Sequence, residues 1–146
     1  MAVGLPGSGK STYLAGIGAN AISSDAIRLQ LADDESDQTI HGHVFATVRH
    51  LAGQRLDLGR PVTYIDATNL TKKDRRQFIE LANKHGASVE ALYFDVPLDV
   101  CEARNARRAR MVPVEALKAM AAKMERPEAD EGFERVKIVS GFAEPL

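Results

Sequence analysis

The amino-acid sequence predicts a single α/β domain, residues 1–146, in which a parallel sheet of about four to five strands is flanked by helices. Two observations support this fold class. Short apolar runs alternate with helical patterns along nearly the whole chain, and a glycine-rich segment joins the first run to the first helix. Such alternation indicates parallel strands whose connecting helices cover both faces of the sheet.

The composition limits the classes of partner. The formal net charge is −1, so an anionic substrate must be met by a local cluster of positive side chains rather than by an overall basic field. One cysteine, Cys101, provides no internal disulfide and no metal-binding spacing. The sequence has no signal-peptide pattern and no apolar run of about eighteen residues, so we expect a cytoplasmic protein without a membrane span.

Five apolar runs are predicted to be strands. Four of them are rich in valine, isoleucine and aromatic residues, which favour buried strands: Ala21–Ser23 and residues 61–66, 89–94 and 136–139. The first strand is short, because only residues 1–3 precede the glycine-rich segment. The sequence leaves open whether the native chain begins upstream of Met1.

Two helical patterns are the clearest. The first covers residues 40–56 and ends before Gly59-Arg60-Pro61, and the second starts after Pro113, a residue favoured in the first turn of a helix. The apolar stripe of the first is Ile40, Val44, Val48, Leu51, Ala52 and Leu56, and that of the second is Val114, Leu117, Ala121 and Met124.

The glycine-rich segment carries the strongest functional signal. Residues 4–11 read Gly-Leu-Pro-Gly-Ser-Gly-Lys-Ser and match the phosphate-binding P-loop at every fixed position. Glycines are needed there because the backbone must wrap a phosphate closely, and the following helix adds its positive dipole end. Lys10 is expected to reach the β- and γ-phosphates of a nucleoside triphosphate such as ATP, and the Ser11 hydroxyl to ligate Mg²⁺. The residues predicted to bind the nucleotide here are Gly7, Ser8, Gly9, Lys10, Ser11 and Thr12.

A P-loop is shared by several classes of nucleotide-binding protein. No Asn/Thr-Lys-x-Asp guanine motif occurs, which argues against a GTPase, and the chain is short for a motor or transporter ATPase domain. The compact kinases remain as the leading class, so the predicted fold is that of a P-loop kinase.

The segment after the second strand is a candidate acceptor site. It reads Ile22-Ser23-Ser24-Asp25, and Arg28 follows Asp25 at i+3 on the same helical face. Because the carboxyl ends of parallel strands form the ligand-binding edge, Asp25 can accept a proton from an acceptor hydroxyl and Arg28 can hold an anionic group. The alternative is a helix cap with a surface ion pair.

Asp66 ends the third predicted strand and stands where a carboxylate approaches the metal, usually through water. We predict that Asp66 supports Mg²⁺ or Lys10. The alternative is capping of the following helix, a role that Thr68, Asn69 or Thr71 could fill equally well.

Two basic runs follow. Four arginines (Arg104, Arg107, Arg108 and Arg110) begin a predicted helical lid at about residues 104–125. Arg104 and Arg108, at i,i+4, are predicted to share one face and to close on the transferring phosphate, where charge develops; the alternative is a solvated helix face. For the other run, Lys72, Lys73, Arg75 and Arg76, a solvated face is the better interpretation. The four histidines show no metal-ligand partners.

Taken in order, these motifs resemble the 5′-hydroxyl polynucleotide kinases. The matching segments are Gly-x-Pro-Gly-Ser-Gly-Lys-Ser-Thr, Ile-Ser-Ser-Asp-x-x-Arg, Asp-Asp-Glu-x-Asp-Gln-Thr, Asp-Ala-Thr-Asn and the Arg-Asn-x-x-Arg lid. The likeness covers residues 4–124 and is closest to the kinase module of bacterial and phage enzymes that heal RNA or DNA ends.

The resemblance implies transfer of the γ-phosphate of a nucleoside triphosphate to the 5′-hydroxyl end of a nucleic acid. It implies that Asp25 is the general base, that Ser24 and Arg28 engage the acceptor, and that Arg104 and Arg108 reach the donor phosphates. The chain leaves no room for the phosphatase or ligase module of many such enzymes, so a stand-alone or excised kinase is expected.

Two other functions remain open. One is a P-loop kinase for a sugar, a nucleoside or an activated sugar, as in zeta-type toxins, which needs an enclosed pocket rather than an open basic channel. The other is a nucleotide-binding switch that hydrolyses slowly, although a switch needs no acceptor base. The sequence does not decide between DNA and RNA, between donor nucleotides, or between oligomeric states.

Overall fold

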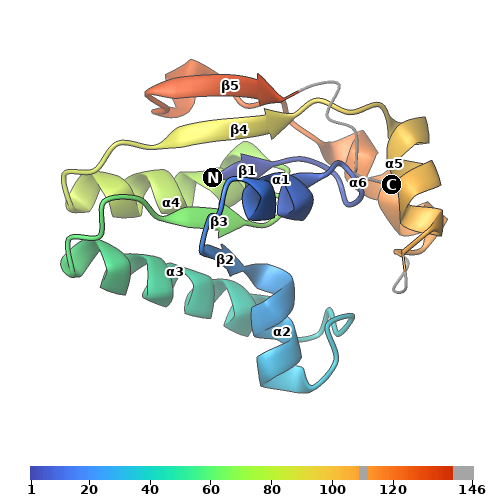
Figure 1. The fold of residues 1–146 in the computed structure, drawn as a ribbon, viewed down its shortest axis with the longest axis horizontal. Coiled ribbons are helices and arrows are strands. Elements are labelled where there is room, and N and C mark those ends of the chain that lie inside the picture. The colour runs from blue at the N-terminus through green and yellow to red at the C-terminus, as the bar shows by residue number, and fades with distance from the viewer. Residues whose placement is uncertain (109–111, 140–146) are drawn as a thin grey trace.

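The computed structural model describes residues 1–108 and 112–139. Strands and helices alternate along the chain (Figure 1). In chain order they are β1 (Ala2–Val3), α1 (Lys10–Gly16), β2 (Ala21–Ser23), α2 (Ser24–Ala32), α3 (His41–Asp57), β3 (Tyr64–Asp66), α4 (Lys72–Lys84), β4 (Glu90–Phe94), α5 (Leu98–Ala106), α6 (Val114–Lys123), the short 3₁₀ helix η1 (Ala129–Glu131) and β5 (Arg135–Val139).

The strands form two parallel hydrogen-bonded groups that lie side by side. One group has the order β1–β4–β5, with Ala2 opposite Leu92, and the other joins β2 to β3. The groups meet at β1 and β3, where the Gly4 N–H donates to the Thr68 carbonyl at 3.0 Å and Asn69 Nδ2 donates to the Ala2 carbonyl at 2.7 Å. The predicted parallel α/β sheet is therefore confirmed.

One predicted strand is too long. The sequence predicted a strand over residues 61–66, but β3 contains only Tyr64–Asp66. The preceding residues are instead held by α3, because Arg55 donates from Nη2 to the Val62 carbonyl at 2.7 Å and from Nε to Thr63 Oγ1 at 3.1 Å. Pro61 also lacks the N–H that a strand ladder needs.

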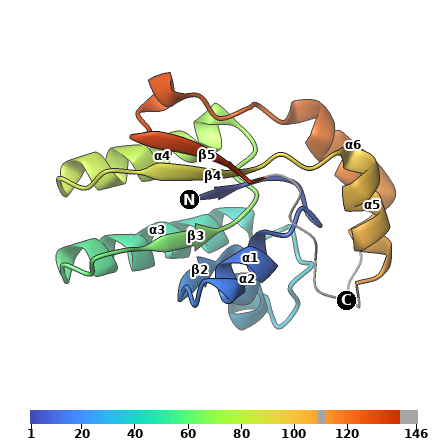
Figure 2. The same ribbon diagram turned by 45° about the horizontal axis from the view of Figure 1, so that its top comes forward.

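Helices cover both faces of the sheet (Figure 2). The two residues of β1 point to opposite sides: Val3 packs with side chains of α3 and α4, whereas Ala2 packs with Leu14 of α1. Val44, Val48 and Ala52 of α3 are buried as predicted. Leu51 is 41% exposed, so the buried stripe of α3 is narrower than the sequence suggested.

A third cluster lies beyond the carboxyl ends of the strands. Leu5 and Leu70 pack there with Cys101 of α5 and Leu117 of α6. Asn105 ties the two helices together, since Nδ2 donates to the Val112 carbonyl at 2.6 Å and Oδ1 accepts from the Val112 N–H at 2.9 Å. None of the helices described combines the length and apolar character needed to cross a membrane.

Candidate active site

The P-loop adopts a backbone that favours glycine at two positions. Gly7 and Gly9 have φ angles of 81° and 95°, in the left-handed region that side chains disfavour. A Cβ atom on Gly7 would also lie 2.7 Å from the Cys101 carbonyl oxygen. Ser8 is completely buried beneath the loop, whereas Thr12 lies on the open side. The loop is thus a tight backbone cradle with room for phosphate on one side only.

Lys10 is the first residue of α1, and its ammonium group turns back into the loop. Nζ donates to the Gly4 carbonyl at 3.0 Å and to the Leu5 carbonyl at 2.8 Å. Burial lowers the pKa of Lys10 to about 8, although the Asp66 and Asp25 carboxylates act in the opposite direction. The N–H groups of Lys10 that could donate to phosphate oxygens therefore donate to these two carbonyls instead.

Ser11 and Asp66 place two oxygens together at the edge of the loop. The Ser11 hydroxyl donates to Asp66 Oδ2 at 2.7 Å, and Asp66 is the last residue of β3. Thr71 caps α4 together with Asp74, so Asp66 is not needed for capping. Because the Ser11 hydroxyl acts as the donor in this hydrogen bond, the lone pairs of its oxygen can still bind a cation. This donor set fits Mg²⁺, a cation that prefers oxygen ligands.

In the candidate acceptor segment, one residue caps the helix and a different residue provides the exposed carboxylate. The Ser23 side chain caps α2 by accepting from the Ala26 N–H at 3.2 Å, and Asp25 lies in the first turn. Arg28 Nη1 donates to Asp25 Oδ1 at 3.3 Å. The i,i+3 ion pair of the alternative is therefore present, but Ser23 rather than Asp25 provides the cap, and the Arg28 side chain is only 6% exposed whereas that of Asp25 is 47% exposed.

Arg28 also carries a buried donor that the described residues leave unused. Its Nε atom is sealed from solvent and has no hydrogen-bond partner in that part of the chain. A buried, unsatisfied guanidinium N–H is costly, and an anionic ligand would remove the cost.

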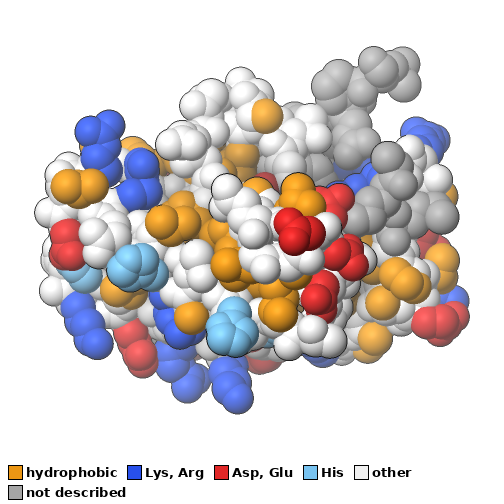
Figure 3. All heavy atoms as spheres, turned by 90° about the horizontal axis from the view of Figure 1, so that it is seen from below, with side chains coloured by type: hydrophobic (Ala, Val, Ile, Leu, Met, Phe, Trp, Pro, Cys, Tyr) orange, Lys and Arg blue, Asp and Glu red, His pale blue; other side chains and the backbone are white. Residues whose placement is uncertain are grey.

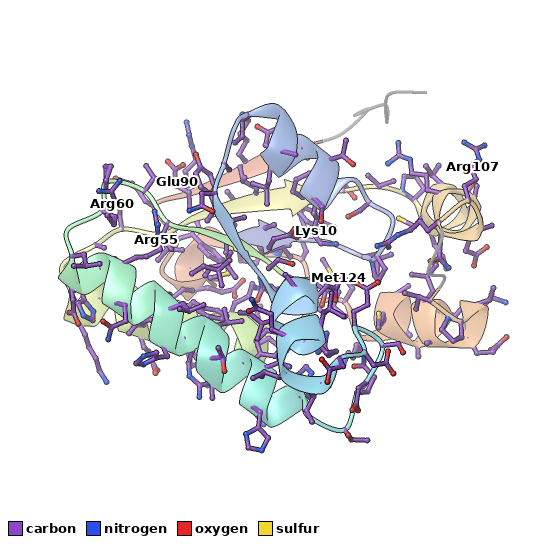
Figure 4. The ribbon with its side chains drawn as sticks, turned by 60° about the horizontal axis from the view of Figure 1, so that its bottom comes forward. Lys10, Arg55, Arg60, Glu90, Arg107 and Met124 are labelled. Carbon is purple, nitrogen blue, oxygen red and sulfur yellow. The ribbon has the colours of Figure 1, made fainter. Side chains whose placement is uncertain are left out.

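One cleft brings the two halves of the predicted site together. It has a volume of about 1340 Å³ and is lined by the P-loop, the starts of α2, α3 and α4, the end of β3 and one face of α6. Figure 4 shows Lys10 in the interior between α1 and α2. The predicted site residues on its wall are Gly7, Gly9, Lys10, Ser11, Thr12, Ser24, Asp25, Arg28, Asp66 and Arg108.

The arginine lid differs from the prediction. Helix α5 ends at Ala106, so Arg104 and Arg108 do not share a helical face. Arg108 lies beyond the helix and lines the cleft, and its charge lowers the pKa of Lys10. Arg104 is absent from the described lining of the cleft, and Arg107 lies on the outer side of α5 (Figure 4). Arg110 is outside the described residues.

The prediction of a solvated face for residues 72–76 is wrong at Arg75. This side chain is completely buried, and it donates twice to Glu131 and once each to the carbonyls of Asn69, Leu70 and Glu125. Glu131 lies 56 residues away in the sequence, so local patterns give no signal for this pair.

Sequence reasoning also missed two aromatic residues of the cleft wall. His41 and Phe45 lie in the first turns of α3 and line the acceptor side. The predicted apolar stripe of this helix contains Ile40 and Val44 but neither His41 nor Phe45. Their i,i+4 spacing was the available signal.

The fold and the site define a class of protein, the P-loop kinase fold, in which parallel strands carry a phosphate loop and a separate acceptor edge. The family model for the AAA domain matches residues 1–127, and the chain belongs to that family. No protein of curated function matches the sequence.

Solved structures share the fold at low sequence identity. A gluconokinase from Sinorhizobium meliloti 1021 is 20% identical, with a TM-score of 0.64, over 99% of this chain and 82% of its own. The APS kinase of Mycobacterium tuberculosis, in complex with AMPPNP and APS, is also 20% identical, with a TM-score of 0.65, over 98% and 87%. A sugar kinase from Janibacter sp. HTCC2649 is 24% identical, with a TM-score of 0.68, over 95% and 82%.

Proposed function

We propose that this chain is an ATP- and Mg²⁺-dependent kinase that transfers the γ-phosphoryl group to a hydroxyl of an acceptor that carries an anionic group. The observation behind this proposal is the shared cleft, in which Lys10 and Ser11 of the P-loop face the same space as Asp25 and Arg28 of α2. A nucleotide-binding switch would need the first pair but not the second.

On the donor side, the P-loop amides and Lys10 would bind the phosphates. Ser11 would ligate Mg²⁺ and Asp66 would hold it through water, and the cation would neutralise charge on the phosphate oxygens. Lys10 would exchange its bonds to the Gly4 and Leu5 carbonyls for bonds to phosphate. Arg108, on the cleft wall, would approach the charge that develops during transfer.

On the acceptor side, Asp25 would act as the general base. The acceptor oxygen bonds to the γ-phosphorus while the bond from that phosphorus to the β,γ-bridging oxygen breaks. The hydroxyl proton passes to the Asp25 carboxylate, and ADP leaves. Arg28, which lines the cleft, would donate to the anionic group of the acceptor and so place its hydroxyl beside Asp25.

A small molecule is the acceptor class that the comparisons favour, because the named neighbours are a gluconokinase, an APS kinase and a sugar kinase. The charge near the acceptor side also suits a small molecule. Residues 33–37 include four carboxylates next to Ser36 and Gln38 of the cleft wall, and Figure 3 shows acidic side chains on the face that α2 presents. Such charge repels a long polyanion.

A polynucleotide 5′-hydroxyl end is the second candidate. The acceptor motif from Ile22 to Arg28, joined to residues 33–39, matches the pattern of the polynucleotide kinases. Arg28 is suited to the first phosphate of a strand as well as to that of a small molecule.

Transfer from γ-labelled ATP with Mg²⁺ tests the proposal. The acceptors are gluconate, adenosine 5′-phosphosulfate, adenosine 3′- and 5′-monophosphate, ribose 5-phosphate and an oligonucleotide with a 5′-hydroxyl. Label should move to one class of acceptor. No label should be transferred by Lys10→Ala, because this variant lacks the ammonium group that would bind the phosphates. Release of label only as inorganic phosphate, whatever the acceptor, would show a hydrolytic switch instead.

A further inference from the structure

Two aromatic side chains stand together on the wall of the acceptor side. His41 begins α3 and Phe45 follows one turn later, so both project from the same helical face. Their ring centroids are 4.6 Å apart and their planes are tilted by 41°. Both rings line the cleft that contains Arg28.

The two rings are held differently. Phe45 is half-buried and packs against the main core, which sets its orientation, whereas His41 is exposed. Partial burial of the ring and the Arg28 guanidinium lower the pKa of His41, with the Lys123 charge acting in the same direction and Asp74 in the opposite one. This shift favours the neutral imidazole.

Gly42, which has no side chain, leaves the cleft wall open beside these rings. It lies in the first turn of α3, and glycine is a weaker helix former than alanine. Its φ is not positive, and a Cβ atom at this position would meet no protein atom within 4 Å. Neither backbone conformation nor packing therefore explains this glycine, although Gly42 does line the cleft.

Core packing alone accounts for Phe45, but it does not account for the exposed ring of His41 or for the bare position at Gly42. A flat ligand that lies across the two rings accounts for all three. Arg28 lines the same cleft, and its buried Nε atom has no hydrogen-bond partner among the described residues, so the anionic group of that ligand would bind beside this guanidinium.

We propose that His41, Gly42 and Phe45 form a stacking surface that selects an acceptor with a planar ring, so that the acceptor is a nucleoside phosphate rather than a sugar acid or sugar phosphate. This inference rests on the proposed function for the roles of Asp25 and Arg28. Stacking of a base on aromatic side chains favours binding by roughly ten- to hundredfold.

The binding test uses a fluorophore that the native chain lacks. The sequence contains no tryptophan, so Phe45→Trp places a single reporter in the stacking surface. The donor site is first saturated with AMPPNP and Mg²⁺. Adenosine 3′- or 5′-monophosphate is then expected to quench the emission, whereas ribose 5-phosphate at equal concentration leaves it unchanged. An oligonucleotide with a 5′-hydroxyl in a further arm distinguishes a strand end from a mononucleotide.

Two variants test the same surface without changing Phe45. His41→Ala should weaken binding of adenosine monophosphate by roughly tenfold, because it removes one stacking partner. Gly42→Ala should also weaken it, because a methyl group then occupies the bare wall, while the melting temperature rises through better helix propensity. Lower ligand affinity in a more stable protein is not a result of structural damage. His43→Ala is the control, since His43 is exposed outside the cleft wall.

The outcomes separate the two proposals. Equal binding of ribose 5-phosphate and adenosine monophosphate, or unchanged affinity in both His41→Ala and Gly42→Ala, would overturn the stacking surface even where transfer to a sugar is active. Ring-dependent quenching with no transfer to any acceptor would instead support the stacking surface and contradict the proposed kinase activity.

Discussion

Two arginines of this domain are almost completely buried beside a carboxylate, and the two pairs differ in how fully they are satisfied. Arg75 makes five hydrogen bonds, and the Glu131 side chain is only 7% exposed. Arg28 bonds to Asp25 at a longer 3.3 Å, its Nε has no partner among the described residues, and the Asp25 side chain is 47% exposed.

The difference indicates what each pair is for. Arg75 joins the loop after β3, the end of the lid and η1, and every direction around its guanidinium is filled by protein, so the pair stabilises the fold. Around Arg28, the Nε donor is buried without a partner among the described residues, and the Asp25 side chain is half exposed. The unsatisfied donor of Arg28 is therefore our reason for proposing a ligand there and not at Arg75.

The largest expected effect tests Asp25. We call Arg28–Asp25 the open pair and Arg75–Glu131 the closed pair. Asp25→Asn keeps the shape of the side chain but removes its basicity, so transfer from labelled ATP should fall by roughly 10²–10⁴-fold. The melting temperature should change little, because Ser23 caps α2 and the amide oxygen of the variant can still accept from Arg28. Normal transfer by this variant would move the base elsewhere, with Asp66 the first candidate.

The arginine of the closed pair should show the opposite behaviour. Arg75→Met removes a buried charge, both hydrogen bonds from Arg75 to Glu131 and those to three carbonyls, which costs roughly 3–5 kcal/mol of unfolding free energy. The melting temperature should fall by about 10 °C in a calorimetric scan. Arg76→Ala, an exposed neighbour, is the control and should change it little. Equal effects of the two variants would remove the distinction between the pairs.

Arg28→Met should lower kcat/KM for the acceptor by roughly ten- to hundredfold, as expected for loss of a hydrogen bond from a charged group. Binding of AMPPNP and the melting temperature should stay as in the native protein, because the fold leaves this guanidinium partly unsatisfied. A large loss of stability would place Arg28 in the same structural class as Arg75.

Arg108 differs from both buried arginines, because it is exposed on the cleft wall. Arg108→Ala is expected to lower kcat by at least roughly tenfold through weaker stabilisation of the transferring phosphate, with no change in stability. Arg107→Ala, on the outer side of α5, is the matched control. If Arg107→Ala lowered kcat as much, the loss would be caused by the lower positive charge of the region and not by a specific contact of Arg108.

The smallest effect is the pH dependence of the closed pair. Burial raises the pKa of Glu131, but hydrogen bonds from Arg75 and from the Glu128 N–H outweigh it and hold the pKa below its ordinary value. The folded state therefore binds protons less readily than the unfolded state. The stabilisation is complete above the unfolded pKa of 4.5 and is lost as the pH falls through the folded pKa.

Melting temperatures of the native protein and Glu131→Gln at several pH values check this effect. The native protein should be the more stable at neutral pH, and the difference should narrow below about pH 4.5. A difference that is the same at acidic and neutral pH would show that the charge of Glu131 does not contribute.

Local rules predicted most of the donor side. The P-loop match fixed where α1 begins, at Lys10, because a phosphate loop runs directly into a helix. The positions of Asp25 and Asp66 at strand ends followed from strand–helix alternation, and the structure places both on one cleft. The catalytic and binding roles of these residues remain predictions.

What the sequence could not predict depends on contacts between distant segments. A period of 3.6 residues identifies the inner face of α4, but it does not say that Glu131 will enter that face and bury Arg75. The end of α5 at Ala106 was missed for a similar reason. The side chain of Asn105 binds both backbone groups of Val112 and so turns the chain before Arg108 can continue the helix.

The contact between Gly7 and Cys101 has a mechanical consequence. The P-loop touches the backbone of α5 so closely that a single methyl group would not fit between them. We therefore expect that a ligand which pushes the loop outward displaces α5 as well. Arg108 follows the C-terminal end of that helix, so its position on the cleft wall should depend on whether the loop is occupied.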